Sequence, residues 1–453
     1  MVRIHPVILA GGSGTRLWPE SRSGFPKQLQ ARAGMPSLFQ SAVLRCADAA
    51  VFTPPLILCH QAHVDEIRRQ LVLIGVEAER IVVEPDGRGT APAVTLAALC
   101  LEDRAPDDRM LVLPSDHVVH RPDRLVDAVT RAGSAAGSGH LVTFGVRPHR
   151  AETGYGYILP GEPVPGHPAC HRVSRFVEKP DAPTAAEWSR SGDWLWNSGV
   201  FLFRADSWLE EVSRLAPGIA HRCREALDGV DGRILRPDRM SFSRCPSNSV
   251  DRAVIERSDN TAVIPFEAGW HDAGSWLSLW EAAGRDEAGN AVAGDVVVDD
   301  VESSLVRAGS RLVVVHGMRD VAIIETPDAV LVLPLARAQE TGRIAGALAA
   351  AGRSEAAHHP EARHPWGRSV ELDRGPGYRV ARLVVDPGAE LLLGPDRTVT
   401  VLSGAGRLAG WPREGRTTPV ATRDTVAIGP GQTATLSNPA EEPLVVIETR
   451  SRE

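Results

Sequence analysis

A short glycine-rich loop directly after an apolar run constrains this chain more than any other feature. Residues 7–10, Val-Ile-Leu-Ala, are typical of a buried strand, and the run ends in Gly11-Gly12-Ser13-Gly14. Because glycine has no side chain, the backbone amides of such a loop can approach and surround a polyphosphate. The spacing differs from the P-loop GxxxxGK[ST] and from GxGxxG, since no Lys-Ser/Thr pair follows the glycines. The loop therefore predicts a phosphate site of another type at the end of a strand.

Lysine is rare in this chain. Of the 50 lysine and arginine residues, only Lys27 and Lys179 are lysines. Lysine carries a compact point charge on a flexible stem, which suits a phosphate oxygen in a narrow site better than a planar guanidinium does. Chance is the alternative explanation. We interpret both lysines as candidate functional residues.

Length and composition exclude several classes of protein. The 453 residues favour two or three domains, and an apolar content of 43% supplies their cores. The net charge of −7 argues against nucleic acid or an anionic membrane as partner. No apolar run approaches the length of a membrane span, no signal peptide is recognisable, and the six cysteines lack CxxC spacing. We therefore expect a cytoplasmic enzyme.

Helical and strand patterns alternate after the glycine loop. Helical periodicity covers residues 37–50, 62–74 and 90–100, and apolar strand patterns cover 55–59, 80–85 and 110–114. This alternation predicts a doubly wound α/β sheet, whose ligands bind beyond the carboxyl ends of the strands. Because the glycine loop, residues 84–90 and residues 115–117 all follow strands, we expect them to meet in one crevice.

Two aspartates stand where a carboxylate needs a role. Asp116 follows a buried strand, where its charge is costly unless it is used, and Asp272 lies in a small-residue turn before a helix. Each is either the N-cap of a following helix or a ligand of a divalent metal. The residues alone leave both alternatives open.

A separate group of polar residues suits a ligand rich in hydroxyl groups. Glu178 precedes Lys179, Asn197 stands in the segment Trp-Asn-Ser-Gly, and Gly154 precedes two tyrosines. In isolation a Glu-Lys-Pro segment is more often a solvated strand end. Together, an acid, an amide and a backbone group supply the hydrogen bonds that a sugar requires.

Taken together, these segments resemble the sugar-1-phosphate nucleotidyltransferases. More narrowly, the chain is similar to the long bacterial mannose-1-phosphate guanylyltransferases, which often carry a mannose-6-phosphate isomerase as their second half. The resemblance spans about residues 4–345 and is carried by residues 9–18, 26–28, 84–93, 113–117, 153–157, 178–180, 196–199 and 272–276. Four positions depart from the family pattern: Glu20, Gly89, Arg252 and His271. Gly89 stands where the family has Asn, which bears on recognition of the base or ribose.

The resemblance implies a Rossmann-like (GT-A-like) catalytic domain and a role for each motif residue. It implies that Asp116 and Asp272 hold Mg²⁺, that Arg16 faces the leaving pyrophosphate and that Lys27 faces the reacting phosphates. These four are the implied catalytic residues. Around the nucleotide the resemblance implies Leu9, Ala10, Gly11, Gly12, Gly14, Thr15, Arg16, Lys27, Glu84, Pro85, Arg88, Gly89, Thr90 and Asp116, and around the sugar phosphate Gly154, Tyr155, Glu178, Lys179, Asn197 and Gly199.

The implied reaction is the Mg²⁺-dependent transfer of GMP from GTP to α-D-mannose 1-phosphate, which gives GDP-mannose and pyrophosphate. No general base is needed, because a phosphate monoester with a second pKa near ~6 is already mostly dianionic at pH 7. Catalysis then reduces to positioning and charge neutralisation. Two alternatives remain: a nucleotidyltransferase for another sugar 1-phosphate or base, and a non-catalytic nucleotide-binding regulator.

The chain continues beyond the catalytic domain. We expect a nucleotidyltransferase domain at residues 1–285, a short left-handed β-helix at 286–352, a linker at 353–364 and a cupin-like β-barrel at 365–453. The family's metal ligands begin in a Leu-Gln-x-His-x-His stretch, whereas residues 391–397 here read LLLGPDR. We therefore expect a degenerate barrel without mannose-6-phosphate isomerase activity. An exposed β-helix also predicts a homodimer.

Overall fold

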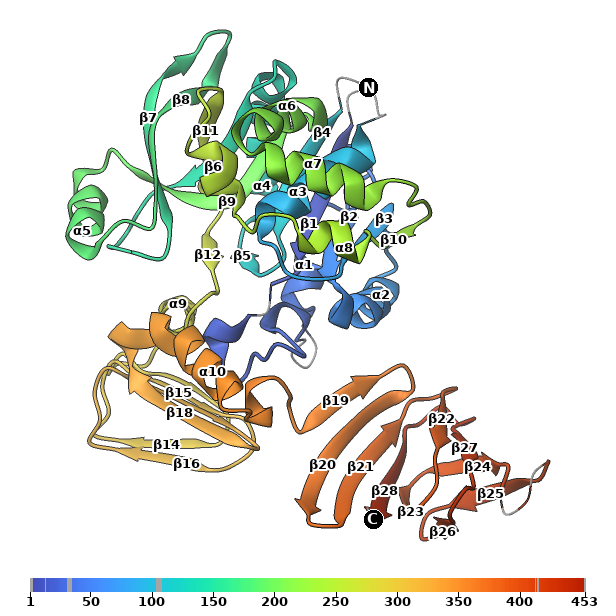
Figure 1. The fold of residues 1–453 in the computed structure, drawn as a ribbon. Coiled ribbons are helices and arrows are strands. Elements are labelled where there is room, and N and C mark those ends of the chain that lie inside the picture. The colour runs from blue at the N-terminus through green and yellow to red at the C-terminus, as the bar shows by residue number, and fades with distance from the viewer. Residues whose placement is uncertain are drawn as a thin grey trace. The chain divides into compact units, whose positions relative to one another are not determined.

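The computed structural model describes residues 3–12, 14–30, 35–102, 108–411, 413 and 415–451. Ser13 of the glycine loop lies outside the described residues. The chain forms two compact units (Figure 1): Met1–Thr326 with Val330–Ala351, and Pro327–Ala329 with Gly352–Glu453.

The first unit is built on a mixed ten-stranded sheet. Its strands are β1 (Ile4–Ala10), β2 (Leu56–His60), β3 (Arg80–Glu84), β4 (Arg109–Pro114), β6 (Leu141–Val146), β7 (Gly156–Val164), β8 (His167–Glu178), β9 (Leu195–Phe203), β10 (Ile234–Leu235) and β11 (Thr261–Pro265), in the order β10-β3-β2-β1-β4-β9-β6-β11-β8-β7. β1 pairs in parallel with β2 and β4, whereas β9 runs antiparallel to β4 and β6. The predicted Rossmann-like α/β fold is confirmed, and the antiparallel strands widen its parallel core.

Helices cover both faces of this sheet (Figure 1). Side chains of a strand point alternately to opposite faces. Val7 of β1 belongs to a core with α3, α6 and α7, while Ile8 and Ala10 belong to a core with α1, α2 and α4. The helices of the domain are α1 (Leu38–Leu44), α2 (Val64–Leu73), α3 (Thr90–Leu101), α4 (Pro122–Gly137), α5 (Ala182–Ser191), α6 (Ala205–Leu215), α7 (Pro217–Leu227), α8 (Arg239–Ser243) and α9 (Trp276–Ala282).

The first helix is shorter than the sequence pattern predicts. The pattern extends to residue 50, but α1 ends at Leu44. Asp48 forms a turn beyond it, because its side chain accepts a hydrogen bond from the backbone N–H of Ala50 at 2.9 Å and its carbonyl accepts from Val51. Among the described residues, no helix combines the length and the apolar character that a membrane span requires.

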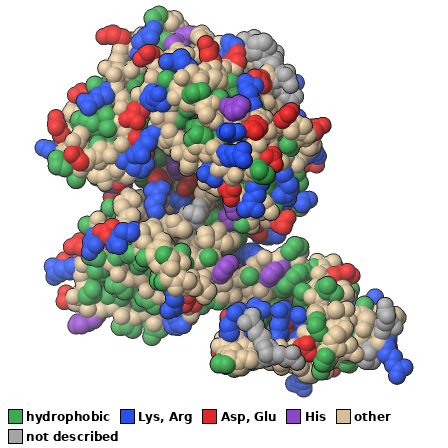
Figure 2. Space-filling view, in the orientation of Figure 1, with side chains coloured by type: hydrophobic (Ala, Val, Ile, Leu, Met, Phe, Trp, Pro, Cys, Tyr) green, Lys and Arg blue, Asp and Glu red, His purple; other side chains and the backbone are tan. Residues whose placement is uncertain are grey.

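A short β-helix completes the first unit. β13 (Ala291–Ala293), β15 (Leu305–Ala308) and β17 (Val321–Thr326) stack in parallel and continue into β18 (Ala329–Pro334), and β14 (Val296–Asp299) pairs in parallel with β16 (Val313–His316). Val306 and Val315 pack inside, whereas Val297 and Val314 lie opposite each other and face solvent. Apolar side chains are visible on this part of the surface in Figure 2. Helix α10 (Thr341–Ala350) follows.

The second unit is a barrel-like pair of antiparallel sheets, as the predicted cupin-like fold requires. One sheet contains β19 (Glu361–His364), β20 (Gly367–Gly375), β21 (Tyr378–Val385), β28 (Leu444–Ser451), β23 (Arg397–Ser403) and β26 (Thr425–Ile428); the other contains β22 (Glu390–Leu393), β27 (Ala434–Ser437), β24 (Ala405–Ala409) and β25 (Thr417–Ala421). Residues 361–364, which the sequence places in a linker, pair with β20 instead. His364 stacks on Trp366 at 4.5 Å between ring centroids, which stabilises the hairpin.

Candidate active site

Two short strands bring Asp116 and Asp272 together. β5 (His117–Val119) and β12 (Trp270–Asp272) pair antiparallel, and Asp272 lies opposite His117. Neither aspartate caps a helix. Ser275 is the N-cap of α9 and accepts a hydrogen bond from the backbone N–H of Ser278, while a strand and not a helix follows Asp116. The N-cap alternative is therefore wrong for both residues.

Lys27 lies between the two carboxylates. Its Nζ is 2.9 Å from Asp116 Oδ2 and 3.9 Å from Asp272 Oδ1, and it donates a hydrogen bond to the carbonyl of Ala273 at 2.8 Å. The Lys27 side chain is only 9% exposed. Burial raises the pKa of Asp116, but the charge and hydrogen bond of Lys27, together with the charges of His117 and Arg16, outweigh this effect and hold that pKa well below its usual range. The carboxyl group of Asp116 is thus ionised at neutral pH.

His117 is a member of this cluster that the predicted set of site residues omits. Its Nε2 is 3.9 Å from Asp116 Oδ1 and 4.0 Å from Asp272 Oδ1, and Trp270 Nε1 donates to its Nδ1 at 3.2 Å. Because Nδ1 accepts this bond, the neutral ring carries its proton on Nε2, which faces both carboxylates. Burial lowers the pKa of His117 despite those carboxylates. Its position directly after Asp116 was a signal for its role.

The donor set suits a magnesium ion. Mg²⁺ binds through one or two carboxylates and keeps several waters, so Asp116 and Asp272 are sufficient protein ligands. Across the described ranges, no cluster of three or more His, Cys, Asp or Glu side chains is arranged as a metal site. Gly274 makes room for the carboxylate of Asp272, because a Cβ at residue 274 would lie 2.6 and 2.7 Å from its two oxygens.

The glycine loop folds back onto the segment that carries Lys27. Gly14 has a φ of 62° and lies against Ser21, whose hydroxyl accepts a hydrogen bond from the Lys27 backbone N–H at 2.9 Å. Gln28 Nε2 donates to the carbonyl of Gly12 at 2.7 Å. Arg16 is exposed, and its charge also lowers the pKa of Asp116. The loop, the lysine and the carboxylates therefore form one site.

Glu84 lies beside the glycine loop in a nearly dry position. It is 5% exposed, and burial raises its pKa to about 8. A Cβ at Gly11 would lie 2.8 Å from Glu84 Oε2, so glycine is required for this close approach. The carboxyl group of Glu84 is thus held largely protonated at the strand end where the resemblance places the nucleotide.

Gly89 is explained by a close backbone contact. It has a φ of 81°, and a Cβ there would overlap the carbonyl oxygen of Asn248, whose carbon would be 2.9 Å away. The Asn248 backbone donates to the carbonyl of Arg88 at 3.1 Å and accepts from Ala91 at 3.1 Å. Thr90 Oγ1 accepts a hydrogen bond from the backbone N–H of Val250 at 2.9 Å. The distant segment around residue 248 thus covers the first turn of α3.

The predicted sugar residues converge at the ends of β7, β8 and β9. A Cβ at Gly156 would lie 2.7 Å from Glu178 Oε2 and 3.3 Å from Asn197 Cβ, which places these two side chains side by side. Lys179 has a φ of 54°, its backbone N–H donates to the carbonyl of Tyr155 at 3.1 Å, and its Nζ forms an ion pair with Glu178. Half of the Lys179 side chain is exposed, so its ammonium group borders open solvent.

Asp251 joins this group, and the sequence reasoning missed it. Asn197 Nδ2 donates to Asp251 Oδ1 at 2.7 Å, while Asn197 Oδ1 accepts from Thr143 at 2.9 Å. Burial and the nearby charge of Glu178 raise the pKa of Asp251 to about 6. Asp251 stands next to Arg252, a position that departs from the family pattern, and the adjacent acid carried no local signal of its own.

The remaining predicted sugar residues connect this group to the carboxylates. The Tyr155 ring is buried against Trp196 and Trp270, at centroid distances of 5.3 and 5.5 Å. The Gly154 N–H donates to a neighbouring glutamate at 2.8 Å, so a sugar contact from Gly154 relies on its carbonyl. A Cβ at Gly199 would lie 3.5 Å from the His117 ring. The predicted sugar residues therefore border the cluster of Asp116, His117 and Asp272.

The interior of the C-terminal barrel holds an ion pair. Arg397 Nη1 is 2.5 Å from Glu448 Oε1, and Arg450 Nε is 2.9 Å from Glu448 Oε2. Arg397 lies in the same inward row as Val399 and Val401, and its Nε is buried without a hydrogen bond. A guanidinium thus lies inside the barrel, in the segment where the resemblance implies metal ligands, and a cation held there by Glu448 does not fit a divalent metal site.

Comparison with known proteins shows two family matches that together span most of the chain. The nucleotidyl transferase family model matches residues 5–289, and the mannose-6-phosphate isomerase C-terminal model matches residues 351–453. The chain is 40% identical over 457 residues to the xanthan biosynthesis protein XanB of Xanthomonas campestris pv. campestris, covering 100% of this chain and 96% of that protein. It is 39% identical over 459 residues to the mannose-1-phosphate guanylyltransferase ManC of Salmonella typhimurium, covering 99% and 95%.

A solved structure shares the fold. The crystal structure described as mannose-1-phosphate geranyltransferase from Thermus thermophilus is 30% identical in sequence and superposes with a TM-score of 0.65. It covers 77% of this chain and 100% of its own. The similarity therefore includes most of the first unit, in which the described carboxylates and glycine loop lie.

Proposed function

Because the chain belongs to the nucleotidyl transferase family and is similar over nearly its whole length to a mannose-1-phosphate guanylyltransferase, we propose that it transfers GMP from GTP to α-D-mannose 1-phosphate. The products are GDP-mannose and pyrophosphate. The observation that carries the proposal is the convergence of Asp116 and Asp272 on Lys27, next to a glycine loop on one side and the sugar residues on the other.

The chain's own residues divide the work of phosphoryl transfer between them. Asp116 and Asp272 would hold Mg²⁺, which would neutralise charge on the nucleotide phosphates. Lys27 contributes a second positive charge at the same place, and Arg16 receives the charge that develops on the leaving pyrophosphate. The amides of the glycine loop support the same phosphates.

The sugar side positions the nucleophile. Lys179 binds the phosphate of the sugar, while Glu178 and Asn197 accept and donate hydrogen bonds to its hydroxyl groups. Gly199, another of the predicted sugar residues, lies against the ring of His117, and this supports a position for the sugar phosphate next to the carboxylates. Since the phosphate is already largely dianionic, no residue has to remove a proton. Orientation of the two phosphates in line then provides most of the rate.

The test is a substrate matrix. Purified full-length protein is incubated with each NTP and each of several sugar 1-phosphates in the presence of Mg²⁺, and released pyrophosphate is measured. We expect release with GTP and mannose 1-phosphate, and a loss of several orders of magnitude in Asp116→Asn and Asp272→Asn. The exposed Asp206→Asn is the matched control. Near-normal turnover in either site variant would remove that residue from the metal site.

Gly89 favours one second candidate, a transferase for another base or sugar. The family pattern has Asn at this position, and the close approach of Asn248 leaves no room for a side chain. The same substrate matrix separates the two candidates, because it ranks the nucleotides by kcat/KM. A complete absence of pyrophosphate release with every pair would instead support a nucleotide-binding regulator.

We also propose that the barrel has no mannose-6-phosphate isomerase activity. Isomerisation on this scaffold needs a metal that polarises the carbonyl, and Arg397 already places a cation next to Glu448. Metal analysis of the full-length protein and conversion of fructose 6-phosphate test this. Stoichiometric transition metal, or conversion above background, would contradict the proposal.

Finally, we propose a homodimer that forms through the β-helix. Val297 and Val314 are 51% and 63% exposed and lie opposite each other on adjacent strands. Paired exposed valines on stacked strands are a surface that a second copy can cover. Light scattering of the wild type and of Val297→Glu with Val314→Glu measures this. A monomeric wild type refutes it.

A further inference from the structure

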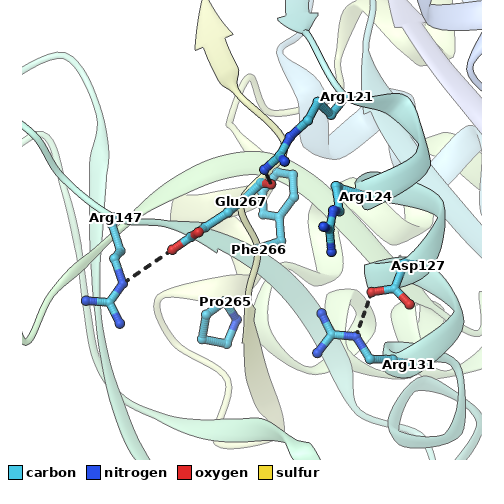
Figure 3. A pocket seen from close by; sticks show the side chains of 8 residues that line it. All are labelled: Arg121, Arg124, Asp127, Arg131, Arg147, Pro265, Phe266 and Glu267. Atoms are coloured by element: carbon cyan, nitrogen blue, oxygen red, sulfur yellow. Dashed lines mark hydrogen bonds and ion pairs between the residues drawn. The ribbon is translucent and has the colours of Figure 1, made fainter.

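A polar cavity lies in the catalytic domain, away from the carboxylates. It has a volume of about 480 Å³ and is lined by α4, by residue 147 and by residues 265–267. Figure 3 shows four arginine side chains around it, Arg121, Arg124, Arg131 and Arg147, with two acidic residues, Asp127 and Glu267. None of these residues belongs to the nucleotide, sugar or metal sets described above.

The lining is positively charged in a chain that is negative overall. Four guanidinium groups against two carboxylates leave an excess of two positive charges, while the chain as a whole carries −7. Arg124 and Arg131 are seven residues apart and therefore lie on one face of α4. Such a local excess attracts anions from solution.

Three of these arginines, Arg124, Arg131 and Arg147, have only weak side-chain partners or none among the described residues. Arg131 Nε lies 3.1 Å from Asp127 Oδ2, and Arg147 Nε lies 3.8 Å from Glu267 Oε1. All four of these side chains are about half exposed or more, so each ion pair contributes little and an anion can displace the carboxylate. Over the described part of the chain, the Arg124 side chain has no hydrogen bond or ion pair, and in Figure 3 it extends toward the cavity.

Arginine is the side chain best suited to phosphate. Its planar fork of N–H donors binds two phosphate oxygens at once, and several such forks select a ligand with more than one negative charge. Pro265 and the buried Phe266 provide an apolar wall beside the charged groups. A phosphorylated small molecule fits this combination of charges and wall.

The cavity is connected to the active site by the ribbon of β5 and β12. Beyond the paired residues, the backbone of His120 donates to the carbonyl of Gly269 at 3.2 Å and that of Arg121 to Ala268 at 2.9 Å. Arg121 Nη2 also donates to the carbonyl of Glu267 at 2.9 Å. The ribbon therefore reaches the cavity at Arg121 and Glu267, and the carboxylates at Asp116 and Asp272. Each pair of positions along one strand is separated by roughly 17 Å, at about 3.3 Å per residue.

We propose that this cavity is a binding site for a multiply charged phosphorylated small molecule, and that its occupancy changes the alignment of Asp116 and Asp272 through the ribbon. The binding half of the proposal is independent of the proposed function; the regulatory half rests on it. A bound phosphate that contacts Arg121 would shift the far end of the ribbon, and the near end of the same ribbon carries Asp116 and Asp272.

Calorimetric titration of the full-length protein tests the binding half. The probes are inorganic pyrophosphate, ADP and fructose 1,6-bisphosphate, each without divalent metal. We expect two classes of site in the wild type and one class in Arg124→Gln with Arg131→Gln, since each lost charge-assisted contact weakens binding roughly tenfold. Arg214→Gln, an exposed arginine on α6, is the control with a matched change of charge. Unchanged far-ultraviolet circular dichroism confirms folding of each variant.

The order of the three affinities identifies the source of the phosphate. Tightest binding of pyrophosphate indicates an inorganic ligand, of ADP a nucleotide, and of fructose 1,6-bisphosphate a sugar phosphate. A wild type with a single class of site for all three probes would overturn the proposal, and so would a double variant that binds like the wild type.

The regulatory half is measured by turnover at saturating substrates. We expect fructose 1,6-bisphosphate to change kcat of the wild type and of Arg214→Gln at least twofold, and to leave the double variant unchanged. Equal responses in all three proteins would overturn the regulatory half. Because calorimetry needs no turnover, a failure of the proposed reaction remains distinguishable from a failure of this site.

Discussion

Replacing Lys27 by methionine tests whether its ammonium group holds the carboxylates of Asp116 and Asp272 together. Methionine keeps much of the length of the side chain and removes the charge. The Nζ atom lies 2.9 Å from Asp116 Oδ2 and 3.9 Å from Asp272 Oδ1. At an effective dielectric constant of about 20, these separations correspond to roughly 6 and 4 kcal/mol of attraction. The desolvation of the buried lysine offsets a large part of this.

We expect Lys27→Met to lower the free energy of unfolding by about 3 kcal/mol, near the lower end of the cost of breaking a buried ion pair. The lower end applies because the Asp116 side chain is 32% exposed, so water replaces part of the lost interaction. Urea unfolding followed by tryptophan fluorescence measures the difference. Addition of Mg²⁺ should restore stability to the variant more than to the wild type, because a divalent cation then separates the carboxylates.

The effect has a defined pH dependence. The pKa of Asp116 is depressed in the folded protein, so its stabilising contribution is present above the unfolded pKa of about 3.9 and is lost as pH falls through the folded value. The difference between wild type and variant should therefore be full at pH 7 and decrease below about pH 4. Lys27→Arg, which keeps the charge, should recover stability but lower kcat. A Lys27→Met protein within about 1 kcal/mol of the wild type at pH 7 would refute the reasoning.

Three further changes test other parts of the structure. Gly89→Ala should raise KM for the nucleotide at least tenfold and lower the melting temperature, because a Cβ there overlaps a backbone carbonyl. Gly87→Ala is the control and should be neutral, because a Cβ at residue 87 meets open space. Equal behaviour of the two variants would contradict this. Burial raises the pKa of Glu84 to about 8, so the contribution of Glu84 to stability is present below about pH 4.5 and is lost as pH rises toward 8. The melting temperature of the wild type should therefore fall relative to that of Glu84→Gln between pH 5 and 8.5. Parallel pH profiles of the two melting temperatures would contradict this. Glu448→Gln leaves Arg397 buried without its counter-charge and should destabilise the barrel by about 3 kcal/mol in urea unfolding; a loss below about 0.5 kcal/mol would show that the ion pair is not structural.

Local patterns were sufficient for the elements that carry the site. The apolar run before the glycine loop, and the position of Asp116 after another apolar run, follow from a few consecutive residues. The parallel core and the convergence of strand ends follow from the alternation of helices and strands. The choice between an N-cap and a metal ligand did not follow, because it depends on the pairing of β5 with β12, two segments about 150 residues apart in the chain.

The residues that sequence reasoning missed act through such distant contacts. Asp251 acquires its role by accepting a hydrogen bond from Asn197, and neither position indicates the other. The segment around Asn248 covers Gly89 only in the folded chain. The first strand of the barrel, β19, was likewise predicted as linker, because its four residues are mostly polar and exposed and show no strand pattern without β20 beside them.

The close approach of Gly89 and Asn248 limits how this protein can diverge. A single mutation toward the asparagine of the family pattern would force a Cβ into the Asn248 carbonyl, which also holds the backbone of Ala91 at the start of α3. Such a mutation would destabilise the fold, so selection would remove it before it could change the nucleotide preference. The residue at position 89 and the course of the chain near position 248 are therefore inherited together. Among descendants of this protein, we expect the two positions to change as a pair.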